Sequence, residues 1–478
     1  MSLPINTRPP SSDVIDALTD VVGAQYAIAD PQDQKPYLSE WRDKYVGKTA
    51  LVLRPQNTKQ VSEILAIANA HQVGIVPQGG NTGLVGGQIP FETGEEIILS
   101  TSRMTRVREH DSNGRTLTVE AGVTLAKVQE LADEIDCLFP LSLAAEGSCQ
   151  IGGNLATNAG GVGVLAYGST RQLVLGLEVV LADGRVWDGL RTLKKDNTGF
   201  DLRDLFVGSE GTLGIITAAA LKLFPKPSEK ATALVGVNTL EAASRLFHHV
   251  SEQSEDLLTA FEFFPHIALE FVTAHMPNAR MPMTSVHPWY VLLETSRGRQ
   301  DDAANQNIET ALSGAMEKDL IVDAIIAQSQ THANDLWRLR EGISEAQKPE
   351  GGSIKHDISV PISSIPEFVQ RANTLIEKMC PGARPVPFGH FGDGNVHYNV
   401  SQPKDADTAA YLEKWNDISH TIHNLVASMG GSISAEHGIG RMKRDELIRF
   451  KAPVEIDIMR NLKTALDPKG ILNPGKLL

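Results

Sequence analysis

Cysteine is scarce in this sequence, and its scarcity argues against two kinds of protein. The chain holds only Cys137, Cys149 and Cys380, widely spaced and without a Cys-x-x-Cys pair. Neither a disulfide framework nor a thiolate zinc site is indicated, and a reducing compartment fits this usage. No run of eighteen apolar residues occurs, and residues 1–10 lack the apolar core of a signal peptide. We therefore expect a cytoplasmic protein with no transmembrane segment.

Excess positive charge and the common nucleotide motifs are also lacking. The formal net charge of -14 argues against nucleic acid or an anionic membrane surface as the main partner. No Gly-x-Gly-x-x-Gly motif opens a helix, which disfavours an NAD enzyme of the Rossmann type, and no Gly-Lys-Ser/Thr loop for a nucleoside triphosphate is found.

The composition that remains is that of a folded protein with several domains. The chain has 478 residues, of which 41% are hydrophobic and 21% charged. At about 150 residues per domain, this length predicts two or three domains. The composition shifts at Pro225-Lys226-Pro227, where we place the first boundary.

Hydrophobic periodicity predicts a mixture of strands and helices, and hence an α+β chain. Before the boundary it predicts strands at 51–53 and 74–77, a helix with Thr58 as its N-cap, a helix over 124–135, and a hairpin over 173–187. After the boundary it predicts strands at 289–294, 320–326 and 353–360, and helices over 301–315 and 336–346.

Three glycine-rich clusters in the first half are candidates for cofactor binding. The cluster at 78–87 follows a predicted strand directly, and its glycines let backbone N–H groups turn towards an anion, as in a phosphate cradle. The cluster at 146–163 is rich in small and amide residues, against which a long, flat cofactor can lie. A third cluster occupies 207–216.

Histidines near the C-terminus suggest a metal site with a general base. His390 and His397 flank a Gly-Asp-Gly-Asn bend, and Glu436 precedes His437 in a second glycine-rich segment. Two imidazoles and a carboxylate suit a divalent metal with an open coordination position, and the remaining histidine suits proton transfer. Asp393 is an alternative candidate for supporting the ligands.

With these motifs in view, the chain resembles flavoproteins of the vanillyl-alcohol oxidase/p-cresol methylhydroxylase (VAO/PCMH) fold. Within that fold it is most similar to the D-2-hydroxyglutarate and D-lactate dehydrogenase group. The resemblance spans residues 36–478 and rests on six motifs: 77–84, 151–161, 208–215, 389–397, Glu436-His437 and 466–474. It implies a PCMH-type FAD-binding domain over 1–228, a ferredoxin-like substrate (cap) domain over 229–430, and a C-terminal segment, 431–478, that completes both sites.

The resemblance also implies which residues bind FAD. They are Pro77, Gly79, Gly80, Asn81, Thr82, Gly83, Leu84, Glu146, Gly147, Ser148, Gly152, Gly153, Asn154, Thr157, Asn158, Gly161, Glu210, Gly211, Ile216 and Asn473. Some family members attach FAD covalently through His or Cys. Neither residue type occurs in 78–87, so we expect non-covalent FAD, although His71 and Cys149 lie elsewhere in the same half.

For the second half, the resemblance implies a substrate site and a metal site. Substrate carboxylates are expected at Arg340, Ser344 and Lys355, with Asn399 as a hydrogen-bonding partner and His437 as the general base. The metal is expected to be zinc, held by His390, His397 and Glu436, although manganese, cobalt or iron accept the same ligands.

These expectations favour an FAD- and metal-dependent dehydrogenase that oxidises D-2-hydroxyglutarate to 2-oxoglutarate. The two cations Arg340 and Lys355 favour a dicarboxylate, because a buried cation without a second carboxylate would be left unpaired. D-lactate and D-malate are alternative substrates, and an oxidase or a non-catalytic flavin electron-transfer subunit are alternative functions. The electron acceptor (electron-transfer flavoprotein, a quinone, a cytochrome or a second 2-oxo acid) stays open, and a homodimer is common in the group.

Overall fold

The computed structural model describes residues 7–254, 257–299 and 303–478. It divides into two units, the first formed by Met1–Gly160, Gly168–Pro225 and Glu436–Leu478, and the second by Gly161–Tyr167 and Lys226–Ala435. The divisions after Pro225 and Ala435 lie within a few residues of the expected boundaries at 228 and 430. The short segment Gly161–Tyr167 belongs to the second unit, whereas the sequence placed it in the first domain.

Unit 1 contains two main sheets. The smaller has the order β1-β2-β4-β3, formed by Ala27–Ile28, Val52–Leu53, Glu96–Ser100 and Gly74–Gln78. The larger is antiparallel, β5-β6-β10-β8-β9, formed by Val107–Asp111, Thr116–Glu120, Ile215–Lys222, Val174–Val180 and Val186–Gly189. A short pair joins β7 (Cys137–Leu138) and β11 (Phe224–Pro225).

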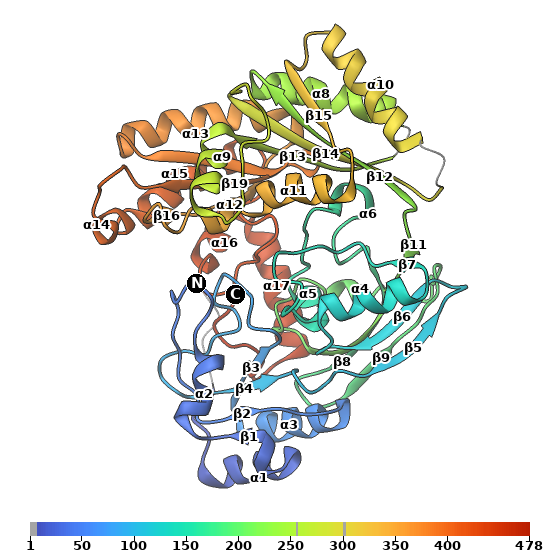
Figure 1. Cartoon of the computed structure of the whole chain (residues 1–478). Helices are drawn as coiled ribbons and strands as arrows, with labels where there is room; N and C mark the ends of the chain where they lie inside the picture. The colour runs from blue at the N-terminus through green and yellow to red at the C-terminus, as the bar shows by residue number, and fades with distance from the viewer. Residues whose placement is uncertain (1–6, 255–256, 300–302) are drawn as a thin grey trace. The chain divides into compact units, whose positions relative to one another are not determined.

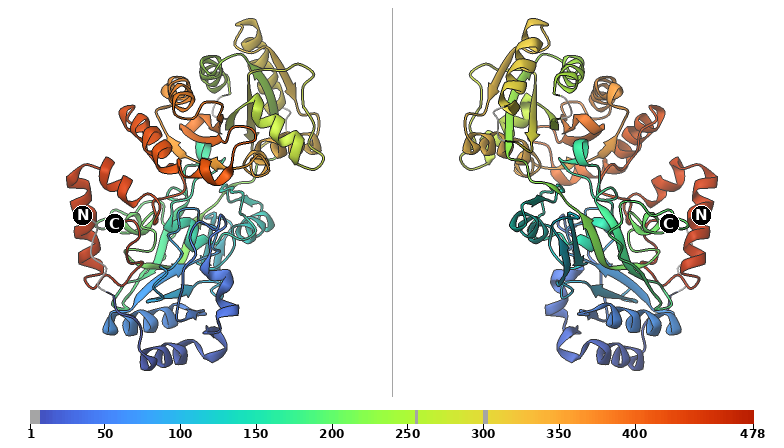
Figure 2. Two further views of the ribbon diagram at one scale, coloured as in Figure 1. Left: turned by 90° about the vertical axis from the view of Figure 1, so that its left-hand side faces the viewer. Right: turned by 90° about the vertical axis from the view of Figure 1, so that its right-hand side faces the viewer.

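Helices of unit 1 bury the apolar faces that the sequence predicts. Helices α3 (Thr58–His71) and α1 (Ser12–Val22) lie beside the smaller sheet (Figures 1 and 2). The buried residues of α3 in their shared core are Val61, Ile64, Leu65 and Ala68. The cap of α3 is Asn57, whose side chain accepts from the Gln60 N–H, so the expectation that Thr58 is the cap was wrong by one residue. The remaining helices are α2 (Pro31–Leu38), α4 (Leu125–Glu134), α5 (Ile151–Ala156), α7 (Arg203–Phe206), α16 (Arg444–Phe450) and α17 (Pro453–Leu466).

The end of the chain returns to the edge of the smaller sheet. Leu472 forms a parallel bridge with Ile75 of β3, and the Ile75 N–H donates to the Ile471 carbonyl (2.8 Å). The buried Lys463 of α17 donates to the carbonyls of Thr212 (2.8 Å) and Leu472 (2.7 Å). These bonds hold the C-terminal segment beside the strand that leads into the first glycine cluster.

Unit 2 is built on one antiparallel sheet with the order β15-β12-β14-β13-β18-β19-β16, and β17 also pairs with β19. Its strands are β12 (Glu229–Val237), β13 (Leu258–Pro265), β14 (Trp289–Arg297), β15 (Asp323–Ile326), β16 (Ser353–Ile354), β17 (Asp357–Ser359), β18 (Arg384–His390) and β19 (Asn395–Ser401). Its helices are α6 (Val164–Tyr167), α8 (Leu240–Gln253), α9 (His266–His275), α10 (Ala303–Glu317), α11 (Gln330–Glu341), α12 (Ile343–Ala346), α13 (Ile365–Met379), α14 (Thr408–Leu412) and α15 (Trp415–Ser428).

Both faces of this sheet carry helices, and strand alternation assigns each side chain to a face (Figure 1). Phe261 and Phe263 of β13 and Val396, Tyr398 and Val400 of β19 join the core formed with α8, α10, α13 and α15. Phe264 of β13 and Phe388 of β18 join the core formed with α9, α11 and α12. Glu262 alternates with Phe261 and Phe263, and His397 with Val396 and Tyr398, so both side chains belong to the face covered by α9, α11 and α12.

Three expected elements of unit 2 differ from the structure, and one of them is the strand expected over 353–360, which is divided into β16 and β17. Strand β15 begins at Asp323 rather than Leu320, and the expected helix over 336–346 is divided into α11 and α12 at Gly342 (φ -68°, ψ -13°). The expected helix start at Asp301 lies outside the described residues, and α10 begins at Ala303. Within the described ranges, every helix is too short or too polar to cross a membrane.

Candidate active site

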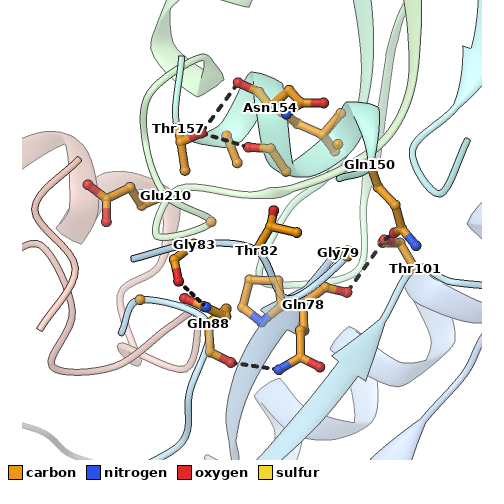
Figure 3. A pocket seen from close by; sticks show the side chains of 18 of the residues that line it. Gln78, Gly79, Thr82, Gly83, Gln88, Thr101, Gln150, Asn154, Thr157 and Glu210 are labelled. Atoms are coloured by element: carbon orange, nitrogen blue, oxygen red, sulfur yellow. Dashed lines mark hydrogen bonds between the residues drawn. The ribbon is translucent and has the colours of Figure 1, made fainter. Parts of the chain in front are cut away.

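A pocket in unit 1 gathers the glycine clusters with the C-terminal segment. Its walls come from the loop after β3, from α5, from the loop before β10 and from the end of the chain (Figure 3). Among the expected cofactor residues, those lining it are Pro77, Gly79, Gly80, Asn81, Thr82, Gly83, Gly152, Gly153, Asn154, Thr157, Glu210, Gly211, Ile216 and Asn473. Leu84, Glu146, Gly147, Ser148 and Asn158 are not in its lining, and Gly161 belongs to unit 2.

Glycine is required where the first two clusters meet. A Cβ on Gly80 would lie 1.9 Å from the carbonyl oxygen of Ser148, far closer than atoms can approach. The carbonyl of Ser148 therefore packs directly against the Gly80 backbone, although Ser148 does not line the pocket itself.

The pocket presents polar atoms that no described residue satisfies. The backbone N–H groups of Gly79 to Gly83 form no hydrogen bond within the described residues, and successive N–H groups of this kind form a nest for an anion. The side-chain oxygens of Asn81, Asn154 and Asn473 are buried and likewise have no described partner. Buried polar groups are normally hydrogen-bonded, so these atoms fit a bound polar cofactor with phosphate groups.

Backbone strain gathers at the same pocket. Asn81, Glu210 and Asn473 adopt positive φ angles of 55°, 52° and 43°, in a region that residues other than glycine seldom occupy. Such conformations persist only where their surroundings hold them, and they cluster at ligand sites. The glutamate is the least expected of the three, because asparagine tolerates this region better.

Glu210 holds the loop that carries His437. Its two carboxylate oxygens accept from the backbone N–H groups of Ile439 and Gly440, each at 2.7 Å. Burial raises the pKa of Glu210, and the two N–H groups only partly offset this rise. His437, two residues before Ile439, lines the same pocket. The expected general base is thereby placed at the expected cofactor site.

Several lining residues escaped the sequence reasoning. Gln78 donates to the Gln88 carbonyl (3.0 Å), and Thr101 donates to the Gln150 side chain (2.7 Å), in bonds that fix the pocket floor (Figure 3). Gln78 is the first residue of the first glycine cluster and Gln88 directly follows its last, so their place in the chain was the available signal. Thr101, which directly follows β4, had no such signal in the sequence.

Cys149 also lines the pocket, so it is the cysteine to consider for covalent attachment of a flavin. Its thiol is buried, and burial raises its pKa, so the neutral and unreactive form is favoured. His71 ends α3 and is not among the lining residues.

In unit 2, the hairpin β18–β19 brings His390 and His397 together. The hairpin turns through Gly394 (φ 87°), and it pairs His390 with Asn395 and His397 with Phe388. The two imidazole centroids are 5.6 Å apart, and one ligand atom of each ring lies within 4.8 Å of the other. The expected bend between the two histidines is confirmed.

Two buried carboxylates that the sequence did not single out support these rings. The Nδ1 of His390 lies 2.8 Å from Oε1 of Glu262, and the Nδ1 of His397 lies 3.7 Å from Oδ1 of Asp357. A carboxylate at Nδ1 leaves Nε2 for a metal, the usual arrangement in metal sites. Asp393 instead accepts from the Asn395 N–H (3.0 Å) and caps the turn.

The third expected ligand, Glu436, begins the last segment of unit 1, so the three-ligand set spans the division and stays a prediction. Within unit 2, the N–H of the preceding residue, Ala435, donates to the Asp357 carbonyl (3.3 Å). The chain therefore leaves unit 2 beside the residue whose carboxylate faces His397. Within unit 1, a Cβ on Gly160 would lie 2.7 Å from Oε1 of Glu436, so glycine makes room for that carboxylate.

The expected substrate residues lie in unit 2, and two of them are in contact. The Lys355 Nζ donates to the Ser344 carbonyl (3.4 Å). Asn399 is buried and donates to the Gln347 side chain (2.9 Å). Arg340 is buried in an ion pair with Glu262 (2.8 Å), so the argument that it needs a substrate carboxylate as its partner does not hold.

Comparison with known proteins now identifies the family. Residues 226–477 match the model of the C-terminal domain of FAD linked oxidases, and residues 49–189 match an FAD binding domain. The chain belongs to the FAD-linked oxidases.

Relatives of this FAD-linked oxidase match along nearly its whole length. It is 38% identical to a mitochondrial D-2-hydroxyglutarate dehydrogenase of Arabidopsis thaliana, over 96% of this chain and 80% of the relative. It is also 38% identical to a D-2-hydroxyglutarate dehydrogenase of Xanthomonas citri pv. viticola, over 96% of each chain. A crystal structure of p-cresol methylhydroxylase with bound substrate aligns with a TM-score of 0.77 at 16% identity, over 97% of this chain and 96% of that one. The expected VAO/PCMH-type fold is confirmed.

Membership in the family assigns FAD to the FAD-linked oxidase. The matched FAD binding domain includes the loop after β3 and α5, which form two walls of the pocket in unit 1. The N–H groups and amide oxygens of that pocket that have no partner among the described residues thus lie where the matched domain holds its cofactor.

Proposed function

We propose that this protein is a D-2-hydroxyglutarate dehydrogenase that uses non-covalent FAD and a divalent metal, most simply zinc. One observation carries the proposal: His437 lines the pocket assigned to FAD, on a loop that Glu210 holds in place. The relatives named D-2-hydroxyglutarate dehydrogenase, which match over nearly the whole chain, supply the substrate.

In this proposal, the chain's residues divide the work between proton transfer and binding. His437 accepts the proton of the substrate hydroxyl as the C2–H bond breaks. FAD, when bound, supplies the acceptor for the hydride from C2, so that a 2-hydroxy acid becomes a 2-oxo acid. The N–H groups of Gly79 to Gly83 hold the cofactor phosphates, and the neutral thiol of Cys149 forms no bond to the flavin.

His390, His397 and Glu436 would hold the metal in this proposal. The chemistry that a bound divalent ion supplies is a lowered pKa of the substrate hydroxyl. The donor set fits such an ion, because both imidazoles have a carboxylate on the Nδ1 side and lie within 4.8 Å of each other.

Lys355, with Ser344 beside it, is the substrate's main cationic contact in this proposal, and Arg340 is a second contact. Arg340 already has Glu262 as a counter-ion, so the pair brings little net positive charge. This observation favours D-lactate as a second candidate, because a monocarboxylate needs fewer cations than D-2-hydroxyglutarate. The substrate choice therefore depends on Lys355.

Anaerobic flavin spectroscopy tests the proposal. Purified protein is titrated with D-2-hydroxyglutarate, D-lactate and L-2-hydroxyglutarate while the visible flavin bands are recorded. We expect D-2-hydroxyglutarate to bleach the flavin at the lowest concentration. Bleaching mainly by D-lactate would retain the mechanism and replace the substrate, whereas an unchanged flavin with every acid would contradict the dehydrogenase.

The His437→Ala variant tests the base. General-base catalysis contributes about 10²–10⁴-fold, so the rate of flavin reduction should fall by this factor while FAD stays bound. The exposed His110 of β5 supplies a control, and His110→Ala should reduce its flavin at the wild-type rate. Wild-type reduction in His437→Ala would remove His437 from the base role.

A further inference from the structure

Glu262 is the most completely buried carboxylate beside the candidate metal and substrate residues, and it contacts one of each. It is 1% exposed. Its Oε1 lies 2.8 Å from Nδ1 of His390, and its Oε2 lies 2.8 Å from Nη2 and 3.0 Å from Nε of Arg340. All three residues belong to unit 2, so the arrangement is internal to one unit.

The sheet dictates this arrangement. Strands β13 and β18 pair with Glu262 directly opposite His390, so the two side chains leave the same face. That face is covered by α11, and Arg340 from its last turn reaches down to the carboxylate. Its guanidinium lies 4.9 Å from the ring centre of Phe388, two residues before His390 on the same face. The guanidinium of Arg340 is thus held by the carboxylate of Glu262 and by the ring of Phe388.

The charges of the three groups explain why a carboxylate is needed. Glu262 is buried, and the likewise buried guanidinium of Arg340 lies 2.8 Å from its Oε2 and supplies the counter-ion of its carboxylate. An ionised carboxylate keeps the proton of neutral His390 on Nδ1, which leaves the Nε2 lone pair for a metal. The same negative charge balances the buried guanidinium, which otherwise would stand close to a metal cation.

We infer that Glu262 is a positioning residue that couples the metal ligand His390 to the substrate residue Arg340. It sets the imidazole tautomer on one side and fixes the guanidinium on the other. This inference rests on the proposed function, because it takes His390 as a ligand and Arg340 as a substrate contact. It adds that the single carboxylate of Glu262 positions both of these side chains.

Zinc affinity of the Glu262→Gln variant tests the coupling. The amide keeps the shape of the side chain but loses its charge. The free zinc concentration for half-occupancy should rise about 10–100-fold, the range typical for removal of such a supporting group. The measurement uses FAD-loaded protein and a competing zinc chelator, so it does not depend on turnover. Retained FAD and an unchanged circular dichroism spectrum check the fold.

Glu350 provides a matched control in the same unit. It also lies between a histidine and an arginine, with Oε1 2.6 Å from Nε2 of His275 and Oε2 bonded to Arg384. Neither partner is a candidate site residue. Glu350→Gln should therefore bind zinc as tightly as wild type and keep the wild-type KM.

A second variant, Arg340→Gln, separates the two sides of the coupling and serves if Glu262→Gln does not fold. It leaves the Glu262–His390 contact in place, so zinc affinity should stay at the wild-type value while KM for the substrate rises. Loss of zinc affinity in Arg340→Gln would contradict the assigned division.

The outcomes also distinguish this inference from the proposed function. Equal zinc affinity in wild type and Glu262→Gln would overturn the role of Glu262 and leave the metal site intact. A wild-type protein that takes up no zinc, manganese or cobalt would overturn the metal site itself.

Discussion

The two candidate sites of this FAD-linked oxidase are built from different materials. The pocket in unit 1 consists of glycines, small residues and exposed backbone N–H groups. The candidate site in unit 2 consists of ionisable side chains that leave one face of an antiparallel sheet. The first site should therefore be sensitive to added side-chain atoms, and the second to lost charge.

One buried glutamate in each unit makes the difference explicit. The carboxylate of Glu210 meets neutral backbone N–H groups, and burial raises its pKa. The carboxylate of Glu262 meets an arginine and a histidine, which overcome its burial and lower its pKa. The pKa values of these two buried carboxylates are thus shifted in opposite directions, because Glu262 is paired with an arginine and a histidine, whereas Glu210 is bonded to backbone N–H groups and gains only a minor contribution from the charge of Lys443.

The largest effect should follow from removing the charge in unit 2. Glu262→Leu leaves the guanidinium of Arg340, which is 7% exposed, without a counter-ion. Breaking one side of a buried pair costs about 3–5 kcal/mol, so we expect the urea midpoint of unit 2 to fall accordingly.

A second substitution sharpens this test. Glu262→Leu/Arg340→Met removes both charges and should recover most of the lost stability, because an apolar pair of similar volume replaces an ion pair at little cost. A double variant as unstable as Glu262→Leu would mean that the side-chain shape, and not the charge, stabilises the sheet.

A smaller effect should follow from adding one methyl group in unit 1. The Cβ of Gly80→Ala would lie 1.9 Å from the Ser148 carbonyl oxygen, so one of the two loops must move. Overpacking costs about 1–3 kcal/mol, which corresponds to about 5–150-fold weaker FAD binding to the apoprotein in a calorimetric titration. Gly298→Ala, whose Cβ meets nothing within 4 Å, should bind FAD normally. Unchanged affinity in Gly80→Ala would contradict the role of this loop contact.

The sequence predicted features that are local in the chain. The glycine clusters, the bend between His390 and His397, and helix α4, expected over 124–135 and found at Leu125–Glu134, all depend on neighbouring residues. Such features follow from turn chemistry and periodicity, which act over a few residues.

Long-range pairing could not be predicted in the same way. Glu262 and His390 are 128 residues apart, and only the register of β13 with β18 brings them together. The ion pair that occupies Arg340 depends on the same register, which is why the sequence argument for a dicarboxylate treated this arginine as unpaired. A shift of one residue in either strand would turn its side chain to the opposite face.

The next prediction concerns how the contribution of Glu210 to stability depends on pH. Both oxygens of its carboxyl group accept backbone N–H groups, whereas the amide nitrogen of Glu210→Gln cannot accept, at a cost of about 1–3 kcal/mol. Because the folded-state pKa of Glu210 is raised, its favourable contribution is complete below the unfolded value, about 4.3, and is lost as pH rises through the folded value.

We therefore expect the difference in melting temperature between wild type and Glu210→Gln to be largest near the unfolded pKa and to narrow as pH increases. Differential scanning fluorimetry across a pH series measures it. A difference in melting temperature that increases with pH would show that the folded protein prefers ionised Glu210. The pKa values of Glu210 and Glu262 would then be shifted in the same direction.

The smallest effect should come from the partly exposed cation of unit 2. Lys355→Met removes a charge beside Ser344, and a partly solvated contact to a carboxylate is worth about 1 kcal/mol, or about fivefold in KM. If Lys355 binds the second carboxylate, KM should rise for D-2-hydroxyglutarate and stay constant for D-lactate. Lys348→Met, which removes an exposed cation paired with Glu345 (3.2 Å), should change neither constant. An equal rise for both substrates would place Lys355 at the carboxylate that they share, and the dicarboxylate preference would then need another cation.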